Sequence, residues 1–135
     1  MGICHRRRGS SSPTVANGSV YVGSFDRKLY AINAASGVKQ WEYKTDGPIL
    51  SSPIVSKEAV YIGSNDYKLY ALDAKTGTKK WESWATNRIQ SSPTVTDSVA
   101  YICSLDGKIY TLDIQTGDKK WNFQTGAVFT HRLRC

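Results

Sequence analysis

Three stretches of eleven residues decide the fold: AINAASGVKQW at residues 31–41, ALDAKTGTKKW at residues 71–81 and TLDIQTGDKKW at residues 111–121. Each reads as the end of a strand, a tight turn closed by a glycine, and a second strand that carries a tryptophan. Trp41, Trp81 and Trp121 lie 40 residues apart, and a fixed period of this length indicates a repeat architecture. Because catalysis needs a given side chain only once, residues that recur in every repeat are interpreted as architectural.

Each repeat opens with Ser-Ser-Pro, at residues 11–13, 51–53 and 91–93, and then shows four short runs rich in aromatic and β-branched residues. The second and third runs, at residues 20–24 and 28–32 in the first repeat, are apolar on both faces. A strand with two apolar faces must be covered on both sides, which a four-stranded meander cannot do for itself. The sequence therefore predicts an all-β fold of three consecutive four-stranded antiparallel blades of a partial β-propeller, each blade covered by its neighbour.

The repeat register sets the expected organisation of the chain. An irregular basic segment spans residues 1–9, the blades span residues 10–50, 51–90 and 91–130, and an irregular tail spans residues 131–135. The Gly-His and Trp-Asp pairs of WD40 blades and the double glycine of kelch blades are missing from the repeats. A β-sandwich would not repeat with this period.

The net charge of +7 on 135 residues raises the question of nucleic acid. Five of the 18 basic residues lie outside the repeats, namely Arg6, Arg7, Arg8, Arg132 and Arg134. The repeats therefore contain 13 basic and 11 acidic residues. A nearly balanced, interspersed charge is typical of an ordinary solvated surface. We therefore expect no nucleic-acid partner. The amino terminus lacks the apolar core of a signal peptide, and no run is long enough for a membrane span.

Candidate catalytic and metal-binding residues are scarce. The two histidines, His5 and His131, and two of the three cysteines, Cys4 and Cys135, lie in the irregular ends; Cys103 stands within a strand, where we expect a small buried thiol. Aspartates recur at the turns instead, where a carboxylate caps its own turn, and one such residue per tip is too few for calcium. The predicted turn-capping residues are Asp26, Asp66, Asp106, Asp73 and Asp113. No metal site and no catalytic residue is predicted.

The second repeat reads Ala71-x-Asp73-x-x-Thr76-Gly77-x-x-x-Trp81, preceded by Ser-Ser-Pro-x-Val and by Val-Tyr-x-Gly-Ser-x-Asp-x-x-Leu-Tyr. This pattern resembles the repeat of the pyrroloquinoline-quinone-like (PQQ-like) β-propellers, which carry a tryptophan-docking motif, and the resemblance covers nearly everything but the two ends. It implies that each tryptophan docks against the adjacent blade. The residues given this structural role are Trp41, Trp81, Trp121, Gly37, Gly77 and Gly117.

The resemblance also implies a ring of seven or eight blades, so the sequence is expected to be a segment of a larger propeller. Some members are quinoprotein dehydrogenases that hold PQQ with calcium, and many of these carry an adjacent cysteine pair that this sequence lacks. Others are non-enzymatic, such as the propeller lipoproteins of bacterial outer-membrane β-barrel assembly. We expect a non-catalytic segment without a cofactor; a dehydrogenase segment that needs PQQ and calcium, or the sensor propeller of a membrane kinase, remain alternatives.

A scaffold of this kind is expected to bind a protein or peptide partner. The turns between the second and third strands and the linkers between blades should lie on one rim, and aromatic and arginine side chains are common in binding hot spots. The candidate rim residues are Phe25, Arg27, Tyr67, Leu105, Trp84 and Arg88, with Ile49 and Asn65 beside them. Ile49 and Trp84 could instead pack between blades. Two further expectations are self-association through uncovered blade faces and, from the resemblance, a periplasmic or other extracytoplasmic location.

Overall fold

A computed structural model describes residues 12–125 of the chain. The predicted segments at residues 1–9 and 131–135, with Cys4, Cys135 and both histidines, lie outside the described residues. In the described part the secondary structure consists of strands and turns, and it includes no long apolar helix that could cross a membrane.

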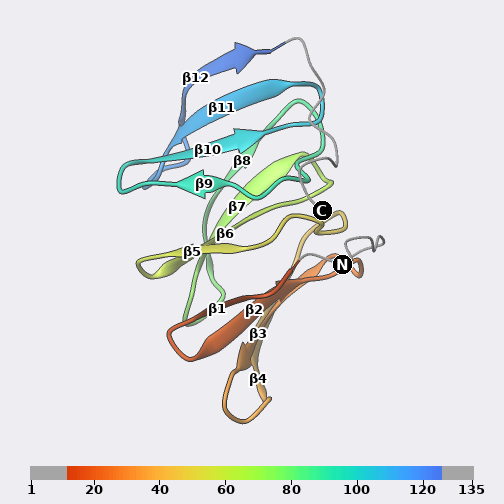
Figure 1. The fold of residues 1–135 in the computed structure, drawn as a ribbon, viewed down its shortest axis with the longest axis vertical. Coiled ribbons are helices and arrows are strands. Elements are labelled where there is room, and N and C mark those ends of the chain that lie inside the picture. The colour runs from red at the N-terminus through yellow and green to blue at the C-terminus, as the bar shows by residue number, and fades with distance from the viewer. Residues whose placement is uncertain (1–11, 126–135) are drawn as a thin grey trace.

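The strands form three separate four-stranded antiparallel sheets, each a meander in chain order (Figure 1). Sheet 1 contains β1 Thr14–Ala16, β2 Ser19–Gly23, β3 Lys28–Asn33 and β4 Lys39–Lys44. Sheet 2 contains β5 Ile54–Ser56, β6 Ala59–Gly63, β7 Lys68–Asp73 and β8 Lys79–Trp84. Sheet 3 contains β9 Thr94–Val95, β10 Val99–Cys103, β11 Lys108–Asp113 and β12 Lys119–Gln124. The predicted all-β fold of three propeller blades is confirmed.

Turn chemistry explains where the strands end. Asn17 and Gly18 both have positive φ, 52° and 80°, which suits the two-residue turn between β1 and β2. Gly37, Gly77 and Gly117 precede the fourth strands with φ of 76°, 78° and 80°, a left-handed conformation that glycine adopts without steric cost. The turn glycines of the repeat are therefore required by the backbone itself.

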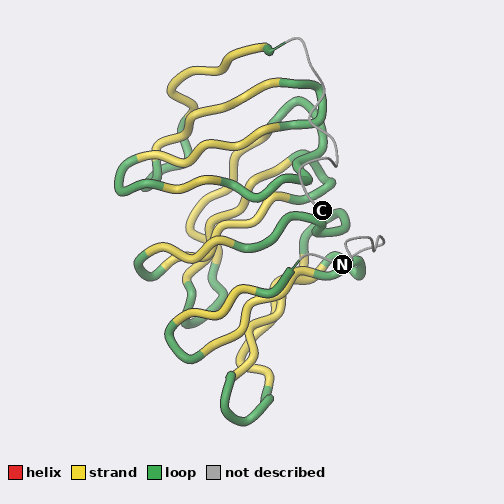
Figure 2. Tube along the Cα trace, in the orientation of Figure 1, coloured by secondary structure: helices red, strands yellow, loops and turns green. Residues whose placement is uncertain are grey.

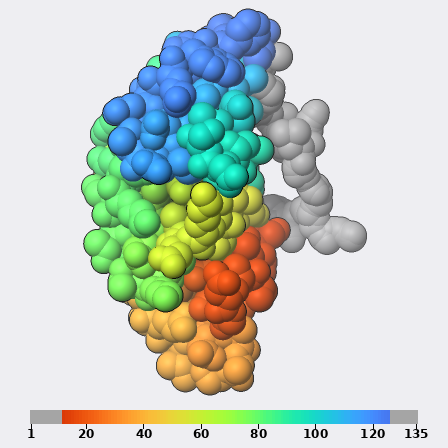
Figure 3. All heavy atoms as spheres, turned by 90° about the vertical axis from the view of Figure 1, so that its left-hand side faces the viewer, coloured from red at the N-terminus to blue at the C-terminus, as the bar shows by residue number. Residues whose placement is uncertain are grey.

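Figure 3 shows the residues of the three sheets following one another along the stack, from orange and red through yellow and green to blue. Two apolar cores join neighbouring sheets. One core joins sheets 1 and 2 and includes Leu29, Ile49 and Val60; the other joins sheets 2 and 3 and includes Leu69, Ile89 and Leu112. All five residues of β6 are buried, whereas all six of β12 are exposed. The middle sheet is thus covered on both faces, as the apolar runs of its strands require.

The Ser-Ser-Pro triplets also link the sheets. The Ser12 amide donates to Ser52 Oγ at 3.1 Å, and the Ser52 amide donates to Ser92 Oγ at 3.0 Å, so the innermost strands are joined in series. Within sheet 2, Ser51 Oγ accepts from the Gly63 amide and donates to the Gly63 carbonyl, both at 2.9 Å. Ser51 thus satisfies the buried amide and carbonyl of Gly63 close to the short strand β5.

Candidate functional site

The candidate site is the rim formed by the β2–β3, β6–β7 and β10–β11 turns (residues 24–27, 64–67 and 104–107) and the linkers between sheets (residues 45–53 and 85–93). Together with Trp84, the last residue of β8, these loops are called the turn–linker rim below. Figure 2 shows these loops along one edge of the stack. The amide of Asn65 donates to the Pro48 carbonyl at 2.9 Å, and the amide of Leu105 donates to the Arg88 carbonyl at 3.0 Å. Each linker therefore lies against the turn of the following sheet, so turns and linkers make one continuous surface.

An aspartate organises each turn of the turn–linker rim. Oδ1 of Asp26, Asp66 and Asp106 accepts a hydrogen bond from the backbone amide two residues later, at 3.1, 3.0 and 3.2 Å. The second oxygen of Asp26 accepts from the Tyr30 hydroxyl at 2.5 Å. That bond lowers the pKa of the Asp26 carboxyl and raises the pKa of Tyr30 to about 12.

The other two turn carboxylates also tie adjacent sheets together. Oδ2 of Asp66 accepts from the Tyr70 hydroxyl and from the amide of Asp46 in the preceding linker, the latter at 3.1 Å. Thr86 Oγ1 donates to Oδ2 of Asp106 at 2.5 Å. Burial opposes ionisation of Asp106, but hydrogen bonds from Ser104 and Thr86 lower the pKa of Asp106 overall.

Asp73 and Asp113 lie away from the rim, at the turns that lead to β8 and β12. Oδ1 of Asp73 accepts from the amides of Lys75 and Thr76, at 2.9 and 3.1 Å, and these bonds lower the pKa of the Asp73 carboxyl. Asp113 makes the equivalent bonds to residues 115 and 116, with the same lowering of its pKa. In sheet 1 the side-chain amide oxygen of Asn33 accepts the equivalent hydrogen bonds from the backbone amides of residues 35 and 36, at 2.9 and 3.0 Å.

Two rim residues hold a strained backbone. Arg27 and Tyr67 have φ of 76° and 78°, a left-handed conformation that is unfavourable for side chains of their size. The equivalent residue in sheet 3 is Gly107, with φ of 89°. The third turn thus has glycine, which adopts this left-handed conformation without strain, whereas the first two turns have Arg27 and Tyr67 in the same conformation. Strain that is retained in this way is a motive for a functional hypothesis.

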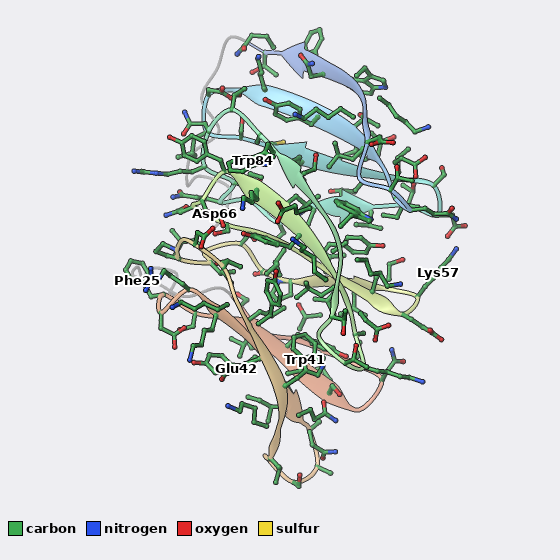
Figure 4. The ribbon with its side chains drawn as sticks, turned by 180° about the vertical axis from the view of Figure 1, so that it is seen from behind. Phe25, Trp41, Glu42, Lys57, Asp66 and Trp84 are labelled. Atoms are coloured by element: carbon green, nitrogen blue, oxygen red, sulfur yellow. The ribbon has the colours of Figure 1, made fainter. Side chains whose placement is uncertain are left out.

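The predicted rim residues do not all face solvent. Phe25, Tyr67 and Trp84 are 56%, 42% and 54% exposed, and Arg27 and Arg88 are exposed as well. Figure 4 shows Phe25 at one edge and Lys57 at the opposite one, with Trp84 between them. Two further candidates are largely covered: Leu105 is half-buried, and half-buried Asn65 accepts a hydrogen bond from Gln90 at 3.0 Å.

Two placements were left open for Ile49, beside the rim or between blades. The structure shows the second, because Ile49 is fully buried between sheets 1 and 2. Its amide donates to the Ser24 carbonyl, which turns its side chain into the core, and Ile89 repeats this arrangement in the next linker. Cys103 is half-buried rather than fully buried at the end of β10, and burial raises the pKa of its thiol. The sequence did not reveal these orientations because each depends on the neighbouring sheet.

Lys68 was missed by the sequence reasoning, although it fixes the position of Trp84. Its ammonium lies 4.5 Å from the centroid of the Trp84 ring, a cation–π distance, and only 12% of its side chain is exposed. Asp46 and Glu82 lie 3.7 and 3.8 Å from the same nitrogen. Trp84 thus has a charged neighbour at its ring while 54% of the residue remains exposed.

The predicted docking residues lie away from the rim, on β4, β8 and β12 and the turns before them. Trp41 Nε1 donates to the Ala74 carbonyl of sheet 2 at 3.1 Å, and Trp81 Nε1 donates to the Ile114 carbonyl of sheet 3 at 3.0 Å. The Trp41 ring covers Gly77 and the Trp81 ring covers Gly117 so closely that a Cβ there would lie 2.6 and 2.4 Å from ring carbons. This pairing of an indole with the next sheet's turn is called the docking contact below.

Trp121 and Gly37 do not take part in a docking contact within the described residues. Trp121 is 51% exposed on β12, against 8% for Trp81. A Cβ added to Gly37 would meet nothing within 4 Å. The expected docking role of these two residues is therefore not realised inside residues 12–125.

PQQ and calcium, which the family resemblance raised, need a cluster of acidic and amide ligands. Among residues 12–125, no group of three or more His, Cys, Asp or Glu side chains is placed to hold a metal ion. The turn carboxylates are spread over three sheets and already accept hydrogen bonds from amides and hydroxyls. The described residues therefore do not fit a calcium site, and no chemical step through the quinone follows from them.

Comparison with known proteins gives a family and a fold. A family model described as "Outer membrane protein assembly factor BamB" matches residues 4–127. A search of curated proteins found no match. BamB from Moraxella catarrhalis superposes with a TM-score of 0.78 at 20% identity, over 85% of this chain and 35% of that one. The predicted resemblance to PQQ-like propellers is confirmed.

Two other solved structures share the fold. The computationally designed Ika8 protein has a TM-score of 0.82 at 14% identity, over 90% of this chain and 38% of that one. Quinohemoprotein alcohol dehydrogenase from Comamonas testosteroni has a TM-score of 0.75 at 24% identity, over 86% of this chain and 21% of that one. The chain thus spans well under half of the length of each structure, and both an assembly factor and an enzyme are among its neighbours.

Proposed function

This chain belongs to the family of the outer membrane protein assembly factor BamB, and from that premise we propose that it is a non-catalytic scaffold that binds a partner protein through the turn–linker rim. The family description also supports an extracytoplasmic place of work. The chemistry of the rim suits a partner segment with apolar and carboxylate side chains, since exposed Phe25, Tyr67 and Trp84 alternate there with Arg27 and Arg88.

One observation carries this proposal. Arg27 and Tyr67 occupy left-handed positions that glycine fills in the third turn. Neither side chain is buried, so the strain is not offset by core packing at these positions. A bulky, exposed side chain at a position where glycine would be less strained supports a binding role for Arg27 and Tyr67.

Rigid support strengthens the case for binding. Trp84 is held by Lys68, and each turn is fixed by its aspartate, so a partner would lose little binding free energy to ordering the rim. The exposed aromatic rings offer apolar area with few rotatable bonds, which is the usual character of a protein-binding anchor. The proposal includes no cofactor and no catalytic residue.

The test uses a phage-displayed peptide library selected on the full chain, followed by fluorescence anisotropy with the selected peptides. The variant R27G/Y67G removes both side chains and relaxes both turns, so a loss of binding cannot be attributed to unfolding. We expect at least a tenfold rise in Kd for R27G/Y67G and for Trp84→Ala, which corresponds to about 1.4 kcal/mol or more. Trp121→Ala is the matched control, because Trp121 is equally exposed but lies outside the rim.

Unchanged affinity in both rim variants would refute the proposal, as would an equal loss in Trp121→Ala. A peptide that binds only to the opposite edge, around Lys57, would do so as well.

A second candidate function, self-association through exposed sheet faces, is favoured by a different observation. Trp121 and Phe123 are 51% and 60% exposed on β12, on the face that is covered by a neighbouring sheet in sheets 1 and 2.

A further inference from the structure

The two docking contacts inside the chain are close copies of each other. In both, an indole of the fourth strand donates to a carbonyl 33 residues further along the chain and lies over the glycine of the next sheet's turn. A tyrosine of the second strand supports each indole: the Tyr21–Trp41 and Tyr61–Trp81 ring centroids are 6.1 and 6.0 Å apart, with interplanar angles of 45° and 47°. One interface design is therefore used twice.

Sheet 3 presents the donor half of this interface without a sheet against it in the described residues. Trp121 and Phe123 are exposed, yet the Tyr101–Trp121 pair already has the arrangement of the covered pairs, with centroids 6.4 Å apart and an angle of 54°. The donor half is thus preformed. Only the covering surface is missing from residues 12–125.

Sheet 1 presents the acceptor half. Asn33 shapes the turn between β3 and β4 with the same two hydrogen bonds that Asp73 makes, so the backbone that receives the indole has the same form. The space above Gly37, where a Cβ would point, is open to 4 Å, whereas Trp41 fills the same space above Gly77. Ala34, the counterpart of Ala74, is exposed, whereas Ala74 is 5% exposed.

From these two half-interfaces we infer that the chain binds a second copy of itself head to tail, with Trp121 of one copy docked over Gly37 and hydrogen-bonded to the Ala34 carbonyl of the other. The occupant is a second copy because the chain itself supplies both complementary halves. They lie at opposite ends of the stack, with β12 at one end and the β3–β4 turn at the other (Figure 1). The contact continues the established interfaces by one further step of the same repeat.

This contact rests on the second candidate function, self-association, and specifies which surfaces meet. It differs from the proposed partner-binding function because it uses the outward faces of sheets 1 and 3 and not the turn–linker rim. It is also heterologous, since the two surfaces that meet are different, so it can be complemented between variants. Across the contact, Phe123 would meet Tyr30 in the way that Tyr43 meets Tyr70, whose ring centroids are 5.7 Å apart with an edge-on angle of 61°.

The experiment measures the mass of the full chain by analytical ultracentrifugation over a range of concentrations, with a reductant present to exclude disulfide-linked species. Trp121→Ala removes the donor half, and Ala34→Glu places a bulky charge on the acceptor half at an exposed position. We expect the parent chain to associate and each variant to require about 30-fold or more higher concentration, the effect of losing a hot-spot tryptophan. Trp84→Ala is the matched control and should associate like the parent.

Mixing the two variants is the decisive step. Ala34→Glu keeps a donor half and Trp121→Ala keeps an acceptor half, so an equimolar mixture should form a 1:1 heterodimer with one intact interface, although neither variant associates alone. Circular dichroism of each variant checks that the fold is retained. A monomeric parent, association of Trp121→Ala equal to the parent, or a mixture that stays monomeric would each overturn the inference. Because peptide binding at the rim is measured separately, failure of either proposal leaves the other standing.

Discussion

Sheets 2 and 3 carry the same tryptophan in opposite environments. Trp81 is 8% exposed and hydrogen-bonded to sheet 3, whereas Trp121, with the same two lysines before it in sequence, is 51% exposed. The supporting tyrosine lies at nearly the same distance in both sheets. The comparison shows that each blade forms its own half of the docking contact, while burial of the indole is decided by the sheet that follows.

The largest difference between these regions should appear when each tryptophan is removed. Trp81→Ala is expected to lower the free energy of unfolding by about 3–5 kcal/mol, since it leaves a cavity between two sheets. Trp121→Ala should lower it by about 0.5 kcal/mol or less in dilute solution, because little packing is lost. Urea unfolding followed by circular dichroism measures both. Equal losses would contradict the comparison.

The turn glycines sharpen the comparison, because all three have nearly the same φ. Gly37→Ala adds a Cβ in open space and should cost only the left-handed strain, about 1–2 kcal/mol. Gly77→Ala adds the same strain and drives the Cβ into Trp41, which should cost about 1–3 kcal/mol more. The difference between the two unfolding free energies isolates the clash. The extra cost of Gly77→Ala should disappear when Trp41→Ala is already present. If the extra cost persists, it does not arise from a clash with the Trp41 ring.

A smaller effect of the opposite sign is expected at the rim. Arg27→Gly and Tyr67→Gly should each stabilise the fold by about 0.5–1 kcal/mol, because relief of the left-handed strain exceeds the added entropy of the unfolded chain. Gly107→Ala is the reverse substitution in sheet 3 and should destabilise. Thermal and urea unfolding provide the measurement. Destabilisation by Arg27→Gly would mean that the side chain makes a stabilising contact and that the argument from strain is wrong.

The smallest expected effect is on the loss of folding stability at acidic pH. The pKa of Asp73 is lowered in the folded chain by amide hydrogen bonds, so this carboxylate contributes stability above its unfolded pKa, which is lost as the pH falls through the folded pKa. Asn33 holds the same turn in sheet 1 without a titrating group. Asp73→Asn should therefore keep most of the stability at pH 7 and show a shallower loss between about pH 4 and pH 2. Urea unfolding midpoints of the parent and of Asp73→Asn, measured across that pH range, test this prediction. If both proteins lose stability equally steeply as the pH falls, the proposed contribution of Asp73 is wrong.

The repeat made much of the fold predictable. Aromatic and β-branched runs at a fixed spacing indicated the strands, and apolar residues on both faces of β6 and β7 required a covering sheet on each side. The tryptophan and glycine of the docking contact were also visible, because they recur in every repeat. Such features are local or periodic, so a single chain displays them without its tertiary structure.

The rim was harder to predict, because linker residues alternate between the surface and the core. The sequence left Ile49 open between the rim and the space between blades, and Ile49 is fully buried, whereas Phe25, placed on the rim, is 56% exposed. The strain at Arg27 and Tyr67 was not expected either, although glycine at position 107 carried a signal of it. The support that Lys68 gives to Trp84 depends on residues from β7, β8 and a linker, which only folding brings together.

By itself the sequence determined the strands, their turns and the need for sheets to cover one another, since these follow from side-chain period, glycine conformation and apolar pattern. Only the tertiary structure decided which copy of each repeated residue is buried. Trp41 and Trp81 lie over the glycine of a following sheet while Trp121 faces solvent, and Gly77 and Gly117 are covered while Gly37 is open. The physical reason is that a residue's burial depends on what packs against it, and in a stack of sheets that surface always belongs to another repeat.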